Sequence, residues 1–101
     1  MLETVPGEVW LTETNGIVKF GDSPQFRYSE ARAARCTRWL FRLADRYDTR
    51  RRGRRSRITR VFVYEWFGAP SGARFDAGLV GEDGAPRPAY FIVRRHARSH
   101  G

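Results

Sequence analysis

Gly7-Glu8-Val9-Trp10-Leu11-Thr12-Glu13 is the stretch that decides the fold, together with Ile58-Thr59-Arg60-Val61-Phe62-Val63-Tyr64-Glu65-Trp66-Phe67. Both stretches are rich in β-branched and aromatic residues, which favour strands. Apolar residues occupy odd and even positions alike in both stretches, a pattern typical of strands buried on both faces in a parallel sheet. We therefore expect two strands, over 7–13 and 58–67, each buried on both faces.

A helix is expected between these strands, from about Ser29 to about Tyr47. Ser29 is a suitable N-cap, and Glu30 places a negative charge in the first turn, where the helix dipole favours it. Apolar residues at alternating spacings of three and four predict the buried face. These residues are Ala33, Cys36, Leu40, Leu43 and Tyr47. The stripe predicts that Cys36 is a buried and inert thiol.

A second helix is expected to open at Pro86-Arg87-Pro88-Ala89-Tyr90, because proline is tolerated in the first helical turn. Its short apolar face would consist of Ala89, Ile92, Val93 and His96. The order strand, helix, strand, helix is a βαβα run, which indicates an α/β fold with a parallel sheet. Two parallel strands alone are not a stable sheet. A (β/α)8 barrel takes eight such units in about 250 residues, so this chain of 101 residues would supply two of them.

The chain is strongly basic, with a formal net charge of +8 from eighteen arginines and the single lysine Lys19. The run Arg50-Arg51-Arg52-Gly53-Arg54-Arg55-Ser56-Arg57 is expected to form an exposed loop over 50–57. It resembles an arginine-rich nucleic-acid patch, so a small basic nucleic-acid-binding or interaction module is the alternative function. The run offers no aromatic ring for base stacking, which argues against nucleic acid as the partner.

The expected strand ends carry the candidate chemistry, since function in parallel α/β proteins collects at the carboxyl ends of strands. Glu13 ends the first strand, and Glu65 lies near the end of the second, beside Trp66. An unpaired buried carboxylate is costly, so such groups are paired, protonated or solvated in a cleft. Carboxylates are the working groups of glycosidases, and an aromatic ring beside them suits the C–H face of a sugar.

The same residues carry a family resemblance. Val9-Trp10-Leu11-Thr12-Glu13-Thr14-Asn15-Gly16 resembles the seventh-strand motif of the large clan of retaining (β/α)8-barrel (TIM-barrel) glycoside hydrolases. Val61-Phe62-Val63-Tyr64-Glu65-Trp66 resembles the eighth strand of that clan. Asp76-Ala77-Gly78-Leu79-Val80 and Gly84-Ala85-Pro86-Arg87-Pro88-Ala89-Tyr90 are similar to the closing loop and last helix of its cellulase-like branch. The resemblance covers nearly the whole chain.

The resemblance implies that residues 1–101 are the C-terminal quarter of a glycoside hydrolase catalytic domain. Such an enzyme cleaves the O-glycosidic bonds of an oligo- or polysaccharide by retaining double displacement. Glu13 would be the nucleophile that attacks the anomeric carbon. The residues that would bind substrate are Trp66, Asn15, Glu65 and Asp76.

The resemblance also implies that an essential group is missing. The acid/base glutamate of the clan ends the fourth strand, which this chain does not include, so the chain alone is expected to be inactive. A self-sufficient pair of Glu13 and Glu65 is the remaining alternative, because adjacent strands lie about 4.8 Å apart and retaining carboxyls about 5–5.5 Å apart.

No cofactor or metal is expected. His96 and His100 are four residues apart but lack a third ligand, and the C-terminal tail that carries them is expected to fray. No apolar run approaches the roughly 20 residues of a membrane span, and no signal peptide is visible, so the localisation stays open. The open strand edges, rich in valine, isoleucine, phenylalanine and tyrosine, predict that the isolated chain is aggregation-prone or molten.

Overall fold

The computed structural model describes residues 7–22, 24–47, 56–70 and 72–100. These residues form two helices and four strands in two small sheets, so the mixed α/β class is confirmed. The elements in chain order are β1 (Gly7–Thr14), β2 (Lys19–Phe20), the 3-10 turn η1 (Pro24–Phe26), α1 (Glu30–Arg46), β3 (Ser56–Val63), β4 (Phe75–Asp76) and α2 (Pro88–His100).

The larger sheet consists of β1 and β3, which pair in parallel as expected. Gly7 lies opposite Ser56 at the amino ends, and Thr14 lies opposite Val63 at the carboxyl ends. Two parallel neighbours require a crossover connection, and α1 provides it. The second sheet is a short antiparallel pair of β2 and β4, which the sequence did not indicate. Each sheet has two strands in the described part of the chain, and no barrel closes there.

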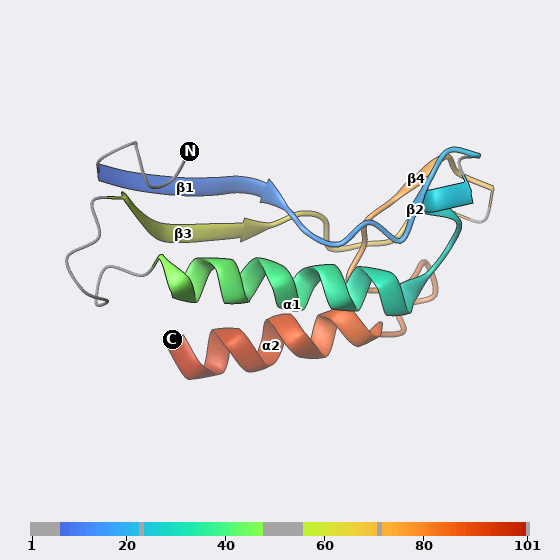
Figure 1. Cartoon of the computed structure of the whole chain (residues 1–101). Coiled ribbons are helices and arrows are strands. Elements are labelled where there is room, and N and C mark those ends of the chain that lie inside the picture. The colour runs from blue at the N-terminus through green and yellow to red at the C-terminus, as the bar shows by residue number, and fades with distance from the viewer. Residues whose placement is uncertain (1–6, 23, 48–55, 71, 101) are drawn as a thin grey trace.

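The helices form a layer against one face of the larger sheet. Figure 1 shows α1 beside β3 and α2 beside α1. The two helices run in the same direction as each other. Two apolar clusters hold these layers together. One joins α1 to the sheet through Ala44, Tyr47 and Ile58, with Val9, Leu11 and Val61 packed against them. The other joins α2 to the segment after β4 through Leu79, Val80 and Ala89, with Val63, Tyr90 and Val93 around them.

The expectation that both strands are buried on both faces is wrong for this chain. Val9, Leu11 and Val61 face the helices, but the aromatic side chains Trp10 and Phe62 are 52% and 47% exposed. Nothing in the described structure covers this second face, because α1 packs on the first and α2 packs on α1. We refer to Trp10, Phe62 and the adjacent Tyr64, which is also exposed, as the aromatic sheet face.

The first helix has the expected ends but a different buried face. Ser29 is the N-cap, and its hydroxyl accepts a hydrogen bond of 3.1 Å from the Arg32 backbone N–H. Cys36 and Leu43 of the expected stripe are exposed. The buried residues are Ala33, Ala34, Thr37, Phe41 and Ala44. Ala33 and Tyr47 are buried as expected, whereas the rest of the buried face is shifted by one residue, to Ala34, Thr37, Phe41 and Ala44.

The second long strand is shorter than expected. β3 ends at Val63, and the chain then leaves the sheet through a cis peptide bond between Tyr64 and Glu65. The 64–68 segment instead bonds to the segment that follows β4. The Gly68 N–H donates to the Val80 carbonyl at 2.6 Å, and the Val80 N–H donates to the Trp66 carbonyl at 2.9 Å.

The second helix begins at Pro88, two residues later than expected, with Ala89 buried and Ile92 and Val93 half-buried. The tail is not frayed at His96, whose ring stacks on Phe41 of α1 with centroids 4.0 Å apart. Neither helix in the described residues has the length and apolar character to cross a membrane. The expected loop over 50–57 falls outside the described residues, except that the backbone of β3 begins at Ser56.

Candidate functional site

The carboxyl ends of β1 and β3 bring three of the predicted site residues to one edge of the sheet. Parallel pairing places Thr14 opposite Val63, and the Tyr64 N–H donates to the Thr14 carbonyl at 3.0 Å. Glu13 precedes this junction, while Glu65 and Trp66 follow it. Glu13 is exposed and Glu65 is half-buried, so both carboxylates reach solvent. We refer to Glu13, Tyr64, Glu65 and Trp66 as the strand-end cluster.

The two carboxylates of this cluster both raise the pKa of the Tyr64 hydroxyl. The negative charge of Glu65 is the largest cause that raises the pKa of Tyr64 above its ordinary value, and the charge of Glu13 acts in the same direction. Tyr64 therefore lies within electrostatic reach of both glutamates and stays protonated at neutral pH. A neutral phenol beside two carboxylates is a hydrogen-bond donor that can orient either of them.

Trp66 presents an open ring next to the carboxylates. Its side chain is 53% exposed, and its ring packs edge-to-face with the Tyr90 ring of α2, with centroids 5.8 Å apart and ring planes at 78°. The Trp66 carbonyl accepts hydrogen bonds from the backbone N–H groups of Leu79 and Val80, at 3.0 and 2.9 Å, which fixes the backbone beneath the ring. The arrangement offers a flat apolar surface held in place from one side.

Asn15 has partners within the fold. Its Nδ2 donates to the Ala77 carbonyl at 2.9 Å, and its Oδ1 lies 2.8 Å from the Thr37 hydroxyl. The side chain thus joins the end of β1 to α1 and to the segment after β4. This role places Asn15 under the strand-end cluster as a support, and the predicted contact with substrate stays a prediction.

Asp76 is also bound within the fold. Its carboxylate is buried and takes two hydrogen bonds from the Arg87 guanidinium, at 2.8 and 2.9 Å, and one from the Gly78 N–H at 2.9 Å. Burial on its own would raise the pKa of Asp76, but the hydrogen bonds from Arg87 and Gly78 and the charge of Arg87 outweigh it, so this pKa lies below its ordinary value. Asp76 is therefore ionised at neutral pH and paired.

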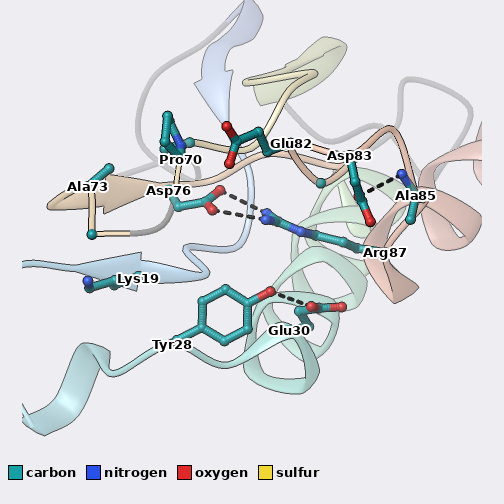
Figure 2. Close-up of a pocket in the computed structure, with 13 residues that line it drawn as sticks. Lys19, Tyr28, Glu30, Pro70, Ala73, Asp76, Glu82, Asp83, Ala85 and Arg87 are labelled. Carbon is teal, nitrogen blue, oxygen red and sulfur yellow. Dashed lines mark hydrogen bonds and ion pairs between the residues drawn. The ribbon is translucent and has the colours of Figure 1, made fainter.

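A large cavity lies beside this ion pair and away from the strand-end cluster. It has a volume of about 850 Å³, and Figure 2 shows the charged and aromatic side chains around it. The lining residues with polar side chains include Lys19, Tyr28, Glu30, Asp76, Glu82 and Arg87. Of the predicted site residues only Asp76 belongs to this lining, so the structure separates Asp76 from Glu13, Glu65 and Trp66.

Three members of this cavity were missed by sequence reasoning. The Tyr28 hydroxyl donates to Glu30 at the start of α1, and Arg87 lies over the Tyr28 ring at 5.8 Å. The signal for Arg87 was present in the sequence, as a charged residue between two prolines in an otherwise apolar helix start.

Among the residues that the structure describes, no group of three or more His, Cys, Asp or Glu side chains is placed to hold a metal ion. Comparison of the chain with protein-family models, with curated proteins and with solved structures gave no match. The function proposed for the chain therefore rests on its residues and their contacts.

Proposed function

We propose that this chain is the C-terminal part of a (β/α)8-barrel glycoside hydrolase of the retaining type, with β1 and β3 as the last two strands of the barrel. The observation that carries the proposal is the parallel pairing of β1 and β3, which gathers Glu13, Tyr64, Glu65 and Trp66 at their carboxyl ends. Active sites of (β/α)8 barrels lie at this end of the strands.

The aromatic sheet face supports the barrel architecture. Each strand of such a barrel turns one face to the helices and the other to an interior that is filled by side chains. In this chain α1 and α2 cover one face, and Trp10 and Phe62 are exposed on the other. Further parallel strands of the same barrel would bury these rings and would satisfy both open strand edges.

Glu13 is proposed as the nucleophile. Its carboxylate would attack the anomeric carbon and form a glycosyl ester, while a second carboxyl group donates a proton to the departing oxygen. Water then attacks the anomeric carbon of the glycosyl ester, the second group, now a carboxylate, takes the proton from that water, and Glu13 leaves as a carboxylate. The Tyr64 hydroxyl is placed to orient Glu13 or Glu65, and the open ring of Trp66 would carry the sugar in the adjacent subsite.

The second carboxyl group is proposed to come from another strand of the barrel. Glu65 is the candidate within this chain; it follows β3, and its charge is the largest cause that raises the pKa of Tyr64. A substrate ring has to fit between the two catalytic groups, which favours a carboxyl from across the barrel mouth.

The test begins with the coding sequence upstream of Met1. An open frame of about 150 or more residues with six further βα units would provide the rest of the barrel. The joined chain is then expressed and assayed on aryl glycosides. Glu13→Ala should lower kcat by several orders of magnitude, and added azide should restore turnover and yield a glycosyl azide of inverted anomeric configuration, because azide takes the place of the missing carboxylate.

The matched control is Glu82→Ala, which removes another exposed glutamate that lines the large cavity and not the strand-end cluster. This variant should keep its activity. The proposal fails if the Glu13→Ala enzyme turns over at the unmodified rate, or if azide restores no product in an enzyme that is otherwise active.

A further inference from the structure

A second surface of the molecule lies on the helical layer, on the side away from the sheet. A groove of about 410 Å³ runs between α1 and α2. We refer to it as the α1–α2 groove, and its main lining residues are Arg38, Arg42, Phe91, Ile92, Arg95 and His96. None of these residues belongs to the strand-end cluster, so this groove is independent of the proposed active site.

The floor of the groove is apolar and rigid. Phe41 of α1 is buried and stacks on His96 of α2, with the two ring planes 11° apart. Ile92 is half-buried beside them, and the Phe91 ring is 50% exposed at the mouth. An occupant gains stability by placing apolar groups here, because it removes the exposed part of Phe91 from water.

The rim of the groove is cationic. Arg38 and Arg42 line it from α1 and Arg95 lines it from α2, and all three are exposed. Guanidinium groups bind carboxylates through two parallel hydrogen bonds, which gives direction as well as charge. The rest of the layer adds to this positive field with further exposed arginines outside the groove. These are Arg35, Arg46, Arg94 and Arg98.

Acidic groups in the described parts of α1 and α2 do not balance this charge. Glu30 lies at the first turn of α1 and accepts the Tyr28 hydroxyl. Asp45 is the other acid of these helices, and it lies in the groove and has an interaction of its own. The helical layer therefore carries a clear excess of positive charge around an apolar floor.

We propose that the α1–α2 groove binds an acidic amphipathic peptide segment of a partner protein, with its apolar side chains on the floor and its carboxylates on the three arginines of the rim. Charge complementarity selects this partner, because the rim is cationic while the floor takes apolar groups. An amphipathic peptide helix fits both the apolar floor and the cationic rim, because its apolar residues lie along one stripe and its acidic residues along the next. A nucleic acid fits less well, because its regular phosphate charges would also have to pass Asp45 and the apolar floor.

The test is a fluorescence anisotropy titration of the full chain against a labelled peptide with leucines at helical spacing and glutamates between them. Arg42→Glu/Arg95→Glu should weaken binding about tenfold or more, because two attractive contacts become repulsive. The matched control is Arg35→Glu/Arg94→Glu, which makes the same charge change on the same helices but outside the groove. This control should weaken binding by about threefold at most, since salt screens charges beyond the contact distance.

Two further measurements separate the groove from net charge alone. Phe91→Ala should weaken binding by a few fold while the far-UV circular dichroism stays unchanged, because Phe91 is exposed. A peptide with the same composition but a scrambled leucine stripe should bind more weakly than the original. The proposal is overturned if both double variants lose affinity equally, if the scrambled peptide binds as well, or if a single-stranded DNA oligomer binds more tightly through Arg42 and Arg95.

Discussion

Asp76 and Arg87 face each other as a buried two-point ion pair, with Oδ1–Nη1 and Oδ2–Nη2 distances of 2.8 and 2.9 Å (Figure 2). The Arg87 Nη1 also donates to the Gly78 carbonyl at 3.0 Å, and the Gly78 N–H donates to Asp76. The pair thus joins β4 to the residue that precedes α2 and fixes the segment between them. Both side chains are less than a tenth exposed, so loss of one partner leaves an uncompensated charge in the interior.

Asp76→Asn is expected to lower the free energy of unfolding by roughly 3–5 kcal/mol at neutral pH, because the Arg87 charge would lose its partner. The folded-state pKa of Asp76 is lowered, so its contribution to stability is present above the unfolded pKa of about 3.9 and is lost as pH falls through the folded pKa. Denaturant unfolding followed by tryptophan fluorescence measures both pH regimes. The difference in the free energy of unfolding between the Asp76→Asn chain and the unmodified chain should shrink in acid.

The control for this prediction is Asp83→Asn, which alters an exposed carboxylate that accepts one hydrogen bond from the Ala85 N–H. It should change the free energy of unfolding much less than Asp76→Asn. A difference between Asp76→Asn and the unmodified chain that stays the same at neutral and acid pH would contradict the linkage to Asp76 ionisation.

Gly16→Ala should destabilise the fold more than Gly84→Ala. A Cβ atom at Gly16 would lie 2.0 Å from the Ala33 carbonyl oxygen, which belongs to the backbone of α1 and cannot move alone. Overpacking of this kind costs roughly 1–3 kcal/mol or more. Gly84 has open space around it but a φ of +86°, so alanine there costs only about 1 kcal/mol of backbone energy. Chemical denaturation of the two variants gives the order, and the reverse order would contradict the close approach of Gly16, which follows β1, to the backbone of α1.

The aromatic sheet face should make the isolated chain self-associate. Trp10 and Phe62 lie with ring centroids 6.2 Å apart on the uncovered face, and the Arg60 guanidinium lies 5.1 Å from the Trp10 ring centre. Trp10→Thr/Phe62→Thr should shift the chain toward the monomer in sedimentation velocity, since β-branched threonine keeps the strands but removes the exposed rings. Trp39→Thr is the control, because Trp39 is more exposed than either ring but lies on α1 and not on the aromatic sheet face. A sharp, reversible thermal transition of the unmodified chain as a monomer would contradict this prediction.

The sequence was informative where a local rule decides the structure. Ser29 and Tyr47 bound α1 as expected, because an N-cap side chain acts on its own helix. The parallel pairing of β1 and β3 followed from their apolar composition and from the helix between them. The pairing of β2 with β4 could not be predicted from the sequence, because each strand has two residues and its partner is distant in the chain.

Burial was harder to predict because it depends on neighbours. Trp10 and Phe62 have the composition of interior residues, yet the described chain provides nothing to cover them. Thr37 is the reverse case: it is fully buried because its hydroxyl lies 2.8 Å from both the Ala33 carbonyl and the Asn15 side chain. Asn15 and Asp76, which were predicted to bind substrate, also have partners within the fold, and their contact with substrate stays a prediction.

Cys36 should react with a thiol reagent in the folded chain, contrary to the expectation of a buried thiol. The structure places Cys36 on the exposed side of α1, because the buried face of the helix passes through Thr37 and Phe41 instead. Labelling with Ellman's reagent without denaturant should reach completion at a rate close to that of the unfolded chain. The control is Ala44→Cys in a Cys36→Ser background, whose thiol lies on the buried face and should react slowly. Equal rates at the two positions would show that α1 is not packed as described.

Trp66→Ala should weaken sugar binding in the joined enzyme that the proposed function requires. The indole is 53% exposed and packs edge-to-face with Tyr90, so its exposed part can stack on a sugar ring. Loss of the ring should raise KM about tenfold for an oligosaccharide, the effect of one good stacking contact. Trp39→Ala removes an indole that is 68% exposed on α1, far along the chain from the strand ends, and should leave KM unchanged. If both variants have the KM of the unmodified enzyme, Trp66 is a packing residue on Tyr90 and the sugar lies elsewhere; if only Trp66→Ala raises KM, the strand ends of β1 and β3 form the substrate site.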